Sequence, residues 1–315
     1  MRTNRFFFYS LLLSVMLLFV SEGGSLFAQT ENDKQIPNPK WAGEIATIQS
    51  RTNKQILKKA KWHRKKIRKG LKVSTCVFDT LYGVPQYLSM LEINPRYYRF
   101  EFVDHKGMRR TSEVAKERGE IAAFNGTFYD MKLGNSVAYL QINGSLIDTS
   151  RHDDIYPQIN GALRIEKGKI EIVDWSPQIE SSKRANIEPD ISYMAAQPML
   201  IREGKTQIPL ADMPGFNVKK HNRSVLFTKG RRVYFLVVDG RAKGFAEGMS
   251  IAELCDLLQN MGARNALNMD GGGSSTLYLS EPYGGSNIVN MPSDNHRFDH
   301  EGERSISNHI AVMLK

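Results

Sequence analysis

Hydrophobic and polar positions alternate in many short strand-like runs, and few stretches have helical periodicity. Runs rich in β-branched and aromatic residues, separated by turn residues, predict strands at residues 72–80, 84–93, 97–103, 120–124, 137–142, 162–166, 169–174 and 232–238. Asn143-Gly144 and Lys167-Gly168 each separate two such runs and predict β-hairpins. Strands and helices do not alternate regularly, and no fixed-period repeat occurs. The pattern predicts an α+β fold with a mixed, multi-stranded sheet and few helices.

Helical patterns occur at about residues 47–69, 111–118 and 250–261. The third begins at Ser250 with Glu253 three residues later, which is the signature of a capping box, and Gly262 follows as a C-terminal cap. The first combines good helix formers with apolar side chains among many basic ones, so it predicts a basic helix that Trp62 packs onto the body.

The N-terminus has the pattern of a signal peptide. Arg2 and Arg5 precede an apolar run at residues 6–20, and Ala28 is a suitable cleavage position. The run is shorter than the ~20 apolar residues that a membrane-spanning helix needs. We expect an exported protein, periplasmic or secreted; an uncleaved N-terminal anchor is the alternative.

The positive charge of the chain is concentrated in one segment. The chain has 43 Lys and Arg against 33 Asp and Glu, a formal net charge of +10, but eleven of those cations lie between Arg51 and Lys72, where there is no acid. The rest of the mature chain is close to neutral, so a nucleic-acid partner is not expected. The basic segment is either a solvated helix over a sheet edge or a contact for an acidic envelope polymer or lipid headgroups. Membrane association is possible only through this arm.

The two cysteines exclude a disulfide-dense scaffold. Cys76 lies in a strand-like run and Cys255 in a helix-like run, so we expect buried thiols; an exported protein also permits a disulfide between them. The histidines form no HExxH motif, and most are expected on the surface or in loops.

The densest group of polar residues surrounds three consecutive glycines, Gly271, Gly272 and Gly273. Asn268 and Asp270 precede them, and Ser274 follows. Consecutive glycines permit sharp turns and close approach to a ligand, and successive N–H groups in such a turn bind anions. This is not a Walker loop, because no GK[ST] occurs and a strand follows. A tight turn without a ligand is the alternative.

Further candidates stand at the ends of predicted strands. Asp239 and Arg241 follow the apolar run 232–238, Asn125 follows another, and Arg223 precedes a third. Arginine can clamp an anion through two parallel hydrogen bonds. Asp130, Asp239, Asn268 and Asp270 offer oxygen ligands compatible with a divalent cation such as Ca²⁺, although none forms a calcium loop. The sequence requires no cofactor and leaves a metal site open.

Five motifs, taken in order, resemble those of the phosphodiester glycosidase family: Asn125-Gly126-Thr127-Phe128, Arg223-Ser224-Val225, Val238-Asp239-Gly240-Arg241, Gly248 to Leu254, and Asn268 to Ser275. The resemblance spans about residues 72–315 and agrees with an α+β fold. Together with the patterns above, it divides the chain into three expected parts: a signal peptide (1–28), a polar lead with a basic, helical arm (29–71) and a catalytic domain (72–315).

The resemblance also implies an activity, the hydrolysis of a sugar-1-phosphodiester with an N-acetylglucosamine-type sugar into free sugar and a phosphomonoester. Asp270 would be the principal catalytic carboxylate and Asp239 the second, or the reverse. The substrate would be bound by Asn125, Arg223, Arg241, Asn268, Gly271, Gly272, Gly273 and Ser274. A non-catalytic binder of phosphorylated or acidic envelope glycans is the alternative. The natural substrate and the oligomeric state are left open.

Overall fold

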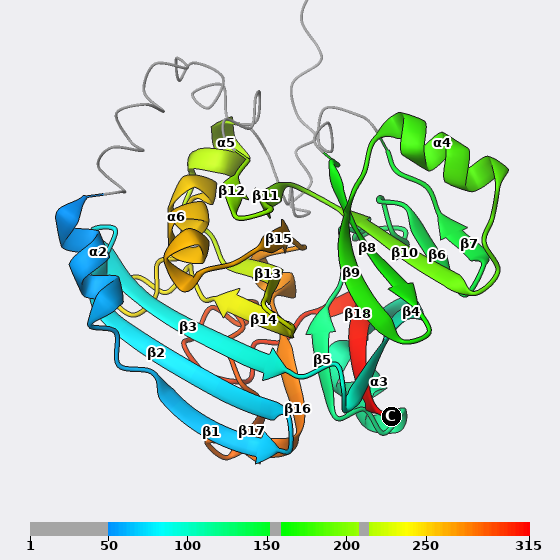
Figure 1. Cartoon of the computed structure of the whole chain (residues 1–315). Coiled ribbons are helices and arrows are strands. Elements are labelled where there is room, and N and C mark those ends of the chain that lie inside the picture. The colour runs from blue at the N-terminus through cyan, green and yellow to red at the C-terminus, as the bar shows by residue number, and fades with distance from the viewer. Residues whose placement is uncertain (1–49, 152–158, 208–213) are drawn as a thin grey trace, which may run out of the picture.

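The computed structural model describes residues 50–151, 159–207 and 214–315 (Figure 1). The predicted signal peptide and the polar lead up to residue 49 lie outside these residues. In the part described, the strands form three sheets and every pair of neighbouring strands is antiparallel. The predicted α+β fold with few helices is confirmed, whereas the single mixed sheet is replaced by three antiparallel ones.

The largest sheet has eight strands in the order β1-β2-β3-β14-β13-β15-β11-β12. They are β1 (His63–Arg68), β2 (Leu71–Leu81), β3 (Val84–Ile93), β11 (Met199–Arg202), β12 (Lys205–Thr206), β13 (Arg223–Lys229), β14 (Arg232–Val238) and β15 (Asn265–Asn268). Three helices accompany this sheet: α2 (Arg51–Lys58), α5 (Pro214–Val218) and α6 (Ile251–Met261). Strand β13 lies between β14 and β15, and the candidate site lies at the ends of these three strands.

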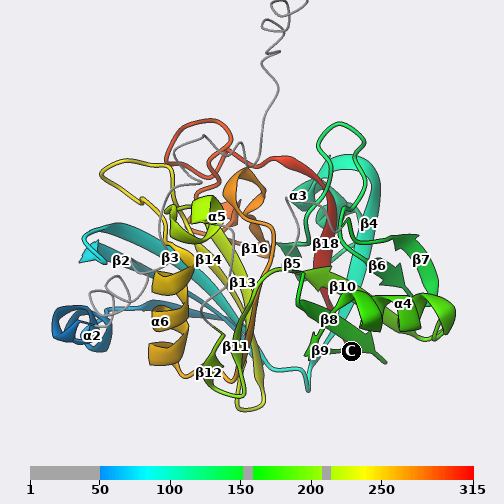
Figure 2. The same ribbon diagram turned by 90° about the horizontal axis from the view of Figure 1, so that it is seen from above.

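A second sheet, β7-β6-β10-β8-β9, is covered by helix α4 (Pro177–Ala185), on the opposite side of the molecule from α6 (Figures 1 and 2). Its strands are β6 (Leu140–Ile142), β7 (Ser145–Asp148), β8 (Gly161–Glu166), β9 (Lys169–Asp174) and β10 (Ile191–Ala196). The third sheet, β17-β16-β5-β18-β4, packs against α3 (Thr111–Glu117). It contains β4 (Tyr98–Arg110), β5 (Ala122–Asn125), β16 (Leu277–Tyr283), β17 (Ser286–Ile288) and β18 (Ser305–Leu314).

Local signals in the sequence account for several of these elements. Ser250 and Glu253 form both hydrogen bonds of the capping box of α6, and Gly262 ends the helix in the left-handed conformation, as predicted. The hairpin β6–β7 turns through Asn143-Gly144, where both residues have positive φ. The hairpin β8–β9 turns through Lys167-Gly168 in the same way.

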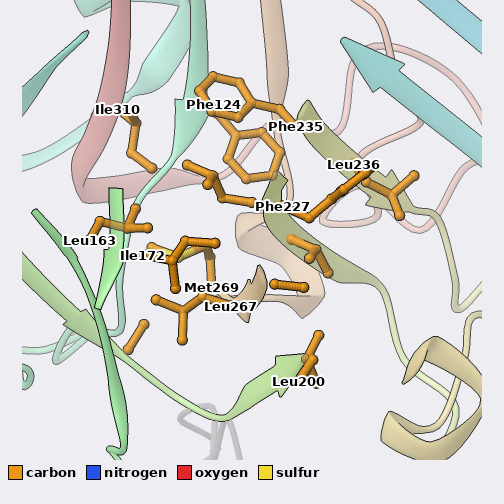
Figure 3. Close-up of a cluster of buried hydrophobic side chains, with 14 of the residues drawn as sticks. Phe124, Leu163, Ile172, Leu200, Phe227, Phe235, Leu236, Leu267, Met269 and Ile310 are labelled. Carbon is orange, nitrogen blue, oxygen red and sulfur yellow. The ribbon is translucent and has the colours of Figure 1, made fainter. Parts of the chain in front are cut away.

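One hydrophobic core joins the three sheets. Phe235 on β14 stacks on Phe124 of β5 with ring centroids 4.7 Å apart, which links the first sheet to the third. Leu163 on β8 and Leu267 on β15 belong to the same buried cluster, which links the second sheet to the first (Figure 3). Complete burial of such side chains stabilises a fold by about 1.5–3 kcal/mol each. Packing of these side chains between the sheets therefore fixes the position of each sheet relative to the others.

The basic segment differs from the prediction. The helix α2 ends at Lys58, and His63–Arg68 form the edge strand β1, paired with β2. A continuous helix over residues 47–69 is therefore wrong in the part described, because backbone pairing with β2 outweighs the local helix preference. Trp62 does pack against the core, as expected. Basic side chains on an exposed edge strand also discourage pairing with other chains.

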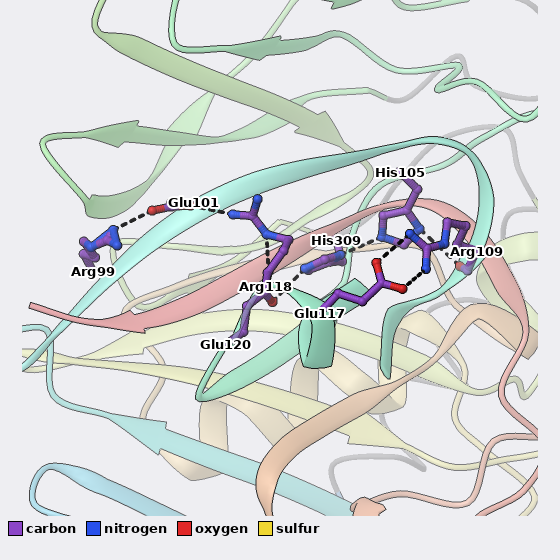
Figure 4. Close-up of polar contacts among 8 residues, drawn as sticks. All are labelled: Arg99, Glu101, His105, Arg109, Glu117, Arg118, Glu120 and His309. Atoms are coloured by element: carbon purple, nitrogen blue, oxygen red, sulfur yellow. Dashed lines mark hydrogen bonds and ion pairs between the residues drawn. The ribbon is translucent and has the colours of Figure 1, made fainter. Parts of the chain in front are cut away.

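A buried polar network ties the third sheet together (Figure 4). His105 Nδ1 lies 2.7 Å from the carbonyl oxygen of Ile306, so this nitrogen carries the proton. His105 Nε2 lies 2.6 Å from His309 Nδ1, and His309 Nε2 lies 2.8 Å from Glu120 Oε2. Burial, followed by the charge of His309, lowers the pKa of His105 to about 4. His309 is buried, an exception to the expectation that most histidines lie on the surface or in loops.

Cys76 and Cys255 are both free and buried, as the sequence favoured over a disulfide. Among the residues that the structure describes, no helix is long and apolar enough to cross a membrane.

Candidate active site

The site forms where three neighbouring strands of the eight-stranded sheet have their ends. Strands β14 and β15 run antiparallel to β13 on either side of it, with Val238 opposite Arg223 and Asn268 opposite Val225. The carboxyl ends of β14 and β15 therefore meet the start of β13. This places Asp239, Arg223 and Asp270 at one edge of the sheet, although they are far apart in the sequence.

After β15 the chain leaves the first sheet, turns through the short 3-10 helix η2 (Gly272–Ser274) and enters β16 of the third sheet. A side chain at Gly271 would meet the carbonyl oxygen of Asn222 at 2.6 Å. At Gly272, where φ is +60°, it would meet Arg241, and at Gly273 it would meet Arg304 at 2.5 Å. The glycines therefore let two guanidinium groups and another segment of backbone approach the turn.

A cavity opens beside this turn. Its lining residues are Phe216, His221, Asn222, Arg223, Arg241, Asn268, Gly271 and Gly272. The structure thus brings together five of the predicted site residues, which come from three separate segments. Asp270 lies between two lining residues in the sequence, but its own side chain is 1% exposed and does not line the cavity.

Asp270 is a buried carboxylate, and one of its oxygens has no hydrogen-bond partner among the described residues. Its Oδ1 accepts a hydrogen bond from the Gly271 amide at 2.9 Å, whereas Oδ2 has no hydrogen-bond partner among the described residues. Burial raises the pKa of Asp270 to about 6, and the Ser274 hydroxyl and the charges of Arg304 and Arg241 oppose part of the rise. A group of this kind is ionised at neutral pH and can interact with positive charge.

Asp239 is equally buried, but its oxygens are already used. Oδ1 accepts from the Asn290 side chain at 3.1 Å and Oδ2 from the Met291 amide at 3.0 Å. Burial raises the pKa of Asp239 to about 7, partly offset by these two hydrogen bonds. Asp239 does not line the cavity. In this structure it fastens the segment after β17 to the end of β14.

Arg223 is almost wholly buried and donates to three main-chain carbonyls, those of Phe216, Lys219 and Met249, at 2.8–2.9 Å. Burial lowers its pKa to about 9. It lines the cavity while holding the segment before β13 to the loop before α6. Its predicted role as a simple anion clamp is therefore combined with a structural one.

Two other arginines flank the glycine turn. The Arg241 guanidinium lies against Gly272, and no hydrogen bond joins it to another described residue. Arg304 lies over Gly273 and is paired with Asp294, with Nε at 2.8 Å from the carboxylate. The charges of both act on Asp270. Together they make the surroundings of the turn positive, in a chain whose bulk charge lies elsewhere.

Three predicted binding residues hold the turn in shape. The Asn125 side chain donates to the Asp270 carbonyl at 2.7 Å and accepts from the Thr276 amide at 3.1 Å. The Asn268 side chain donates to the Gln197 carbonyl, but its Oδ1 is buried without a partner in the described part of the chain. The Ser274 hydroxyl lies 3.3 Å from the Tyr129 hydroxyl. Of these, only Asn268 lines the cavity.

The glycine amides are less open than the sequence suggested. The amides of Gly271, Gly272 and Ser274 each donate within the turn or to Asn222, at 2.9–3.2 Å. No hydrogen bond from the Gly273 amide to a described residue is found. A nest of several successive free N–H groups is therefore not what the turn presents, because it closes by its own 3-10 hydrogen bonds.

His221 and Asn222 line the cavity, and the sequence did not single them out as binding residues. His221 Nδ1 and Asn222 Nδ2 are buried without a hydrogen-bond partner among the described residues. Burial, together with the charges of Arg223 and Arg241, lowers the pKa of His221 to about 3, so this imidazole is neutral. The cavity has a volume of about 20 Å³, so its unpaired buried polar atoms are suited to a small polar group. Their position directly before Arg223 was the only signal in the sequence.

No group of three or more His, Cys, Asp or Glu side chains is arranged to hold a metal ion in residues 50–151, 159–207 and 214–315. Asp130, one of the four predicted oxygen ligands, accepts from the Lys132 and Leu133 amides and pairs with Arg151. Asp239 is engaged as described above. The described residues therefore give a divalent cation no preformed set of ligands at this site.

Comparison with models of protein families matches residues 118–313 to the family described as phosphodiester glycosidase. No curated protein gave a match. Among solved structures, a hypothetical protein from Synechocystis superposes with a TM-score of 0.63 at 13% identity, covering 81% of this chain and 64% of the other. The chain thus spans less than two thirds of the length of that protein.

Two further solved structures share the fold. The catalytic domain of zebrafish N-acetylglucosamine-1-phosphodiester alpha-N-acetylglucosaminidase, auto-inhibited by its pro-peptide, has a TM-score of 0.60 at 17% identity, with 81% of this chain and 88% of the other covered. A putative exported protein from Burkholderia pseudomallei has a TM-score of 0.54 at 13% identity, with 73% and 74% covered.

Proposed function

The chain belongs to the phosphodiester glycosidase family, and from this we propose that it hydrolyses a sugar-1-phosphodiester with an N-acetylglucosamine-type sugar. Water would replace the phosphate at C1 of the sugar, and the products would be the free sugar and a phosphomonoester. The observation that carries the proposal is that Oδ2 of Asp270 is buried without a hydrogen-bond partner among the described residues, beside a turn flanked by two arginines.

The proposed reaction breaks the bond between C1 and the phosphate oxygen, and the electron pair of that bond stays with the phosphate. C1 becomes oxocarbenium-like, so an ionised carboxylate nearby stabilises the transition state. Asp270 is suited to this role because its pKa of about 6 leaves it ionised at neutral pH. The water that adds to C1 loses its proton to the leaving phosphate or to solvent.

The leaving group needs less acid catalysis than an ordinary glycoside does. A phosphomonoester has a second pKa of about 6, so it departs as a weak base. Positive groups near its oxygens help more, because negative charge increases there as the bond breaks. Arg241 and Arg304 flank the turn and would supply that charge, with the neutral side chains of His221, Asn222 and Asn268 as polar contacts.

The role of Asp239 as a second catalytic carboxylate stays a prediction. For this role Asp239 would have to lose the hydrogen bond that it accepts from Asn290 or from Met291. With both bonds in place, Asp239 is a positioning residue that holds the loops around the site.

One observation favours the alternative, a non-catalytic binder of phosphorylated glycans. The described lining of the cavity contains arginines, amides and a neutral imidazole but no carboxylate. Such a binder would retain the phosphodiester intact, whereas the enzyme would release its two parts.

The test is a product assay on N-acetylglucosamine-1-phosphodiesters and ordinary α-N-acetylglucosaminides. We expect free sugar and phosphomonoester from the former only. The double variant Arg241→Gln, Arg304→Gln should lower kcat/KM by about 10²-fold or more, while Arg264→Gln, which removes an exposed pair with Glu203, serves as the matched control. Tight retention of the intact diester would identify a binder, and equal turnover of the α-glycosides would contradict the proposed leaving group.

Export is a separate part of the proposal and rests on the pattern of residues 1–28, which lie outside the described residues. Mass spectrometry of the N-terminus of the mature protein from periplasm or medium tests it. A start near Gln29 supports export, whereas a retained Met1 in the cytoplasm contradicts it.

A further inference from the structure

Phe245 is an exposed aromatic residue in the loop that begins at Arg241, one of the residues that line the cavity. It is 62% exposed and lies in the loop between β14 and α6, four residues after Arg241. Its ring stacks on that of Phe298, with centroids 5.5 Å apart and an interplanar angle of 21°. Phe298 in turn meets Tyr87 edge to face at 5.6 Å. The outer ring of this stack is thus supported from below while remaining open to solvent.

The two stacked rings belong to the two loops that carry the arginines. The loop with Phe245 is closed by hydrogen bonds between Ala242 and Ala246 at 2.8 and 2.9 Å, and it begins with Arg241. Phe298 belongs to the segment between β17 and β18, which also carries Arg304. The aromatic contact therefore joins the two loops that bring positive charge to the glycine turn.

Both loops are also fixed at a common point. Asp239, directly before the first loop, accepts hydrogen bonds from Asn290 and Met291, at the start of the second segment. The stack is consequently held in a defined position relative to the arginines. A preorganised aromatic surface loses little freedom when a ligand binds to it.

We propose that Phe245, supported by Phe298, binds a six-membered sugar ring on the alcohol side of the phosphodiester. This inference rests on the proposed function, in which C1 of the other sugar lies at Asp270. Because Asp270 is buried and Phe245 is exposed, the group beyond the phosphate is the one that reaches the rim. The negative face of an aromatic ring attracts the polarised C–H groups that line one face of a pyranose. The neighbouring arginines would bind the phosphate attached to that ring.

The test uses pairs of ligands that differ only in the alcohol. Binding of a hexopyranose phosphomonoester and of methyl phosphate is measured by calorimetry, and kcat/KM is measured for the matching N-acetylglucosamine-1-phosphodiesters. We expect the wild type to prefer the ring-containing member of each pair, and Phe245→Ala to reduce this preference by about tenfold. Phe245→Trp should retain the preference, because it keeps an aromatic face.

Ile187→Ala is the matched control, since Ile187 is an exposed hydrophobic residue that follows α4 in the sequence, and α4 lies on the opposite side of the molecule from α6 (Figure 1). It should leave the preference unchanged. Equal or undetectable affinity of the wild type for the two phosphates overturns the inference, as does a preference that survives in Phe245→Ala. A preference that depends on Phe245, in a protein that hydrolyses neither diester, supports the platform and refutes the proposed hydrolase.

Discussion

Asp239 and Asp270 occupy equivalent places in the sheet and have different surroundings. Each follows a strand that neighbours β13, and each is almost fully buried. Asp239 has a hydrogen-bond donor on each oxygen, from a side chain and an amide that lie about 50 residues further along. Asp270 accepts a backbone hydrogen bond on Oδ1, and its buried Oδ2 has no hydrogen-bond partner among the described residues, while the Ser274 hydroxyl helps to lower its pKa.

A raised pKa does not by itself distinguish a catalytic carboxylate from a structural one in this protein. Burial is the largest cause of both raised pKa values, about 7 and about 6, so the direction of the shift does not separate a catalytic carboxylate from a structural one. The separation comes from the remaining hydrogen-bonding capacity and from neighbouring charge. By both criteria Asp270 is the better candidate for the catalytic carboxylate that we propose, whereas both oxygens of Asp239 hold neighbouring loops.

The largest expected effect is that of Asp270→Asn. We expect kcat/KM for a sugar-1-phosphodiester to fall by roughly 10³-fold or more, because the amide cannot stabilise a developing positive charge. The melting temperature should stay the same or rise, since the variant no longer buries an ionised group. Asp256→Asn is the control, because Asp256, in helix α6, is also buried with a raised pKa but accepts a hydrogen bond from Tyr82, in the turn between β2 and β3. Full activity of Asp270→Asn would remove Asp270 from the mechanism.

A smaller effect is expected at Asp239. Asp239→Asn places an amide donor opposite a donor, and Asn290→Ala removes the same contact from the other side. We expect both variants to lose about 1–3 kcal/mol in the free energy of unfolding, measured by denaturant titration, and to lose activity to a similar, moderate extent. If Asp239→Asn were inactive while Asn290→Ala retained activity at equal stability, Asp239 would be the second catalytic carboxylate predicted from the sequence.

The smallest effects concern pH. If ionised Asp270 is required, activity at constant stability should rise as the pH passes about 6 and then level off. A rate that falls over the same interval would instead make protonated Asp270 the reactive form.

The stability of the fold should respond to pH through the same two groups. Both carboxyls have pKa values raised by folding, so the folded state binds more protons than the unfolded state between about pH 4 and 7. Their contribution to the free energy of unfolding is therefore present at low pH and lost as the pH rises through about 6 and 7. His105 and His221, whose pKa values are lowered, contribute with the opposite sign.

Comparison of the wild type with each Asn variant isolates the carboxyl contributions from those of the histidines. Denaturant titrations from pH 4.5 to 8 should show that Asp239→Asn removes the decline that extends to about pH 7. A wild type and variant with parallel pH curves would show that Asp239 titrates normally.

Much of the fold was predictable because its signals are local. The capping box of α6, the two hairpin turns and the strand at residues 84–93 depend on neighbouring residues, and each is found where the sequence placed it. The basic segment was mispredicted in part. Its residues favour a helix locally, but His63–Arg68 form strand β1 because they pair with β2. Pairing of this kind involves a partner strand that local patterns do not specify.

The sequence by itself determined the family motifs, the glycine turn and the presence of two acids at the ends of apolar strands. Tertiary structure alone decided which acid is open, because the donors that occupy Asp239 come from a distant segment, and it alone placed Arg304 beside that turn. It also turned Arg223 from an expected clamp into a residue that donates to three carbonyls. A polar group is available for chemistry only after folding has assigned its hydrogen bonds, and those assignments depend on contacts between distant parts of the chain.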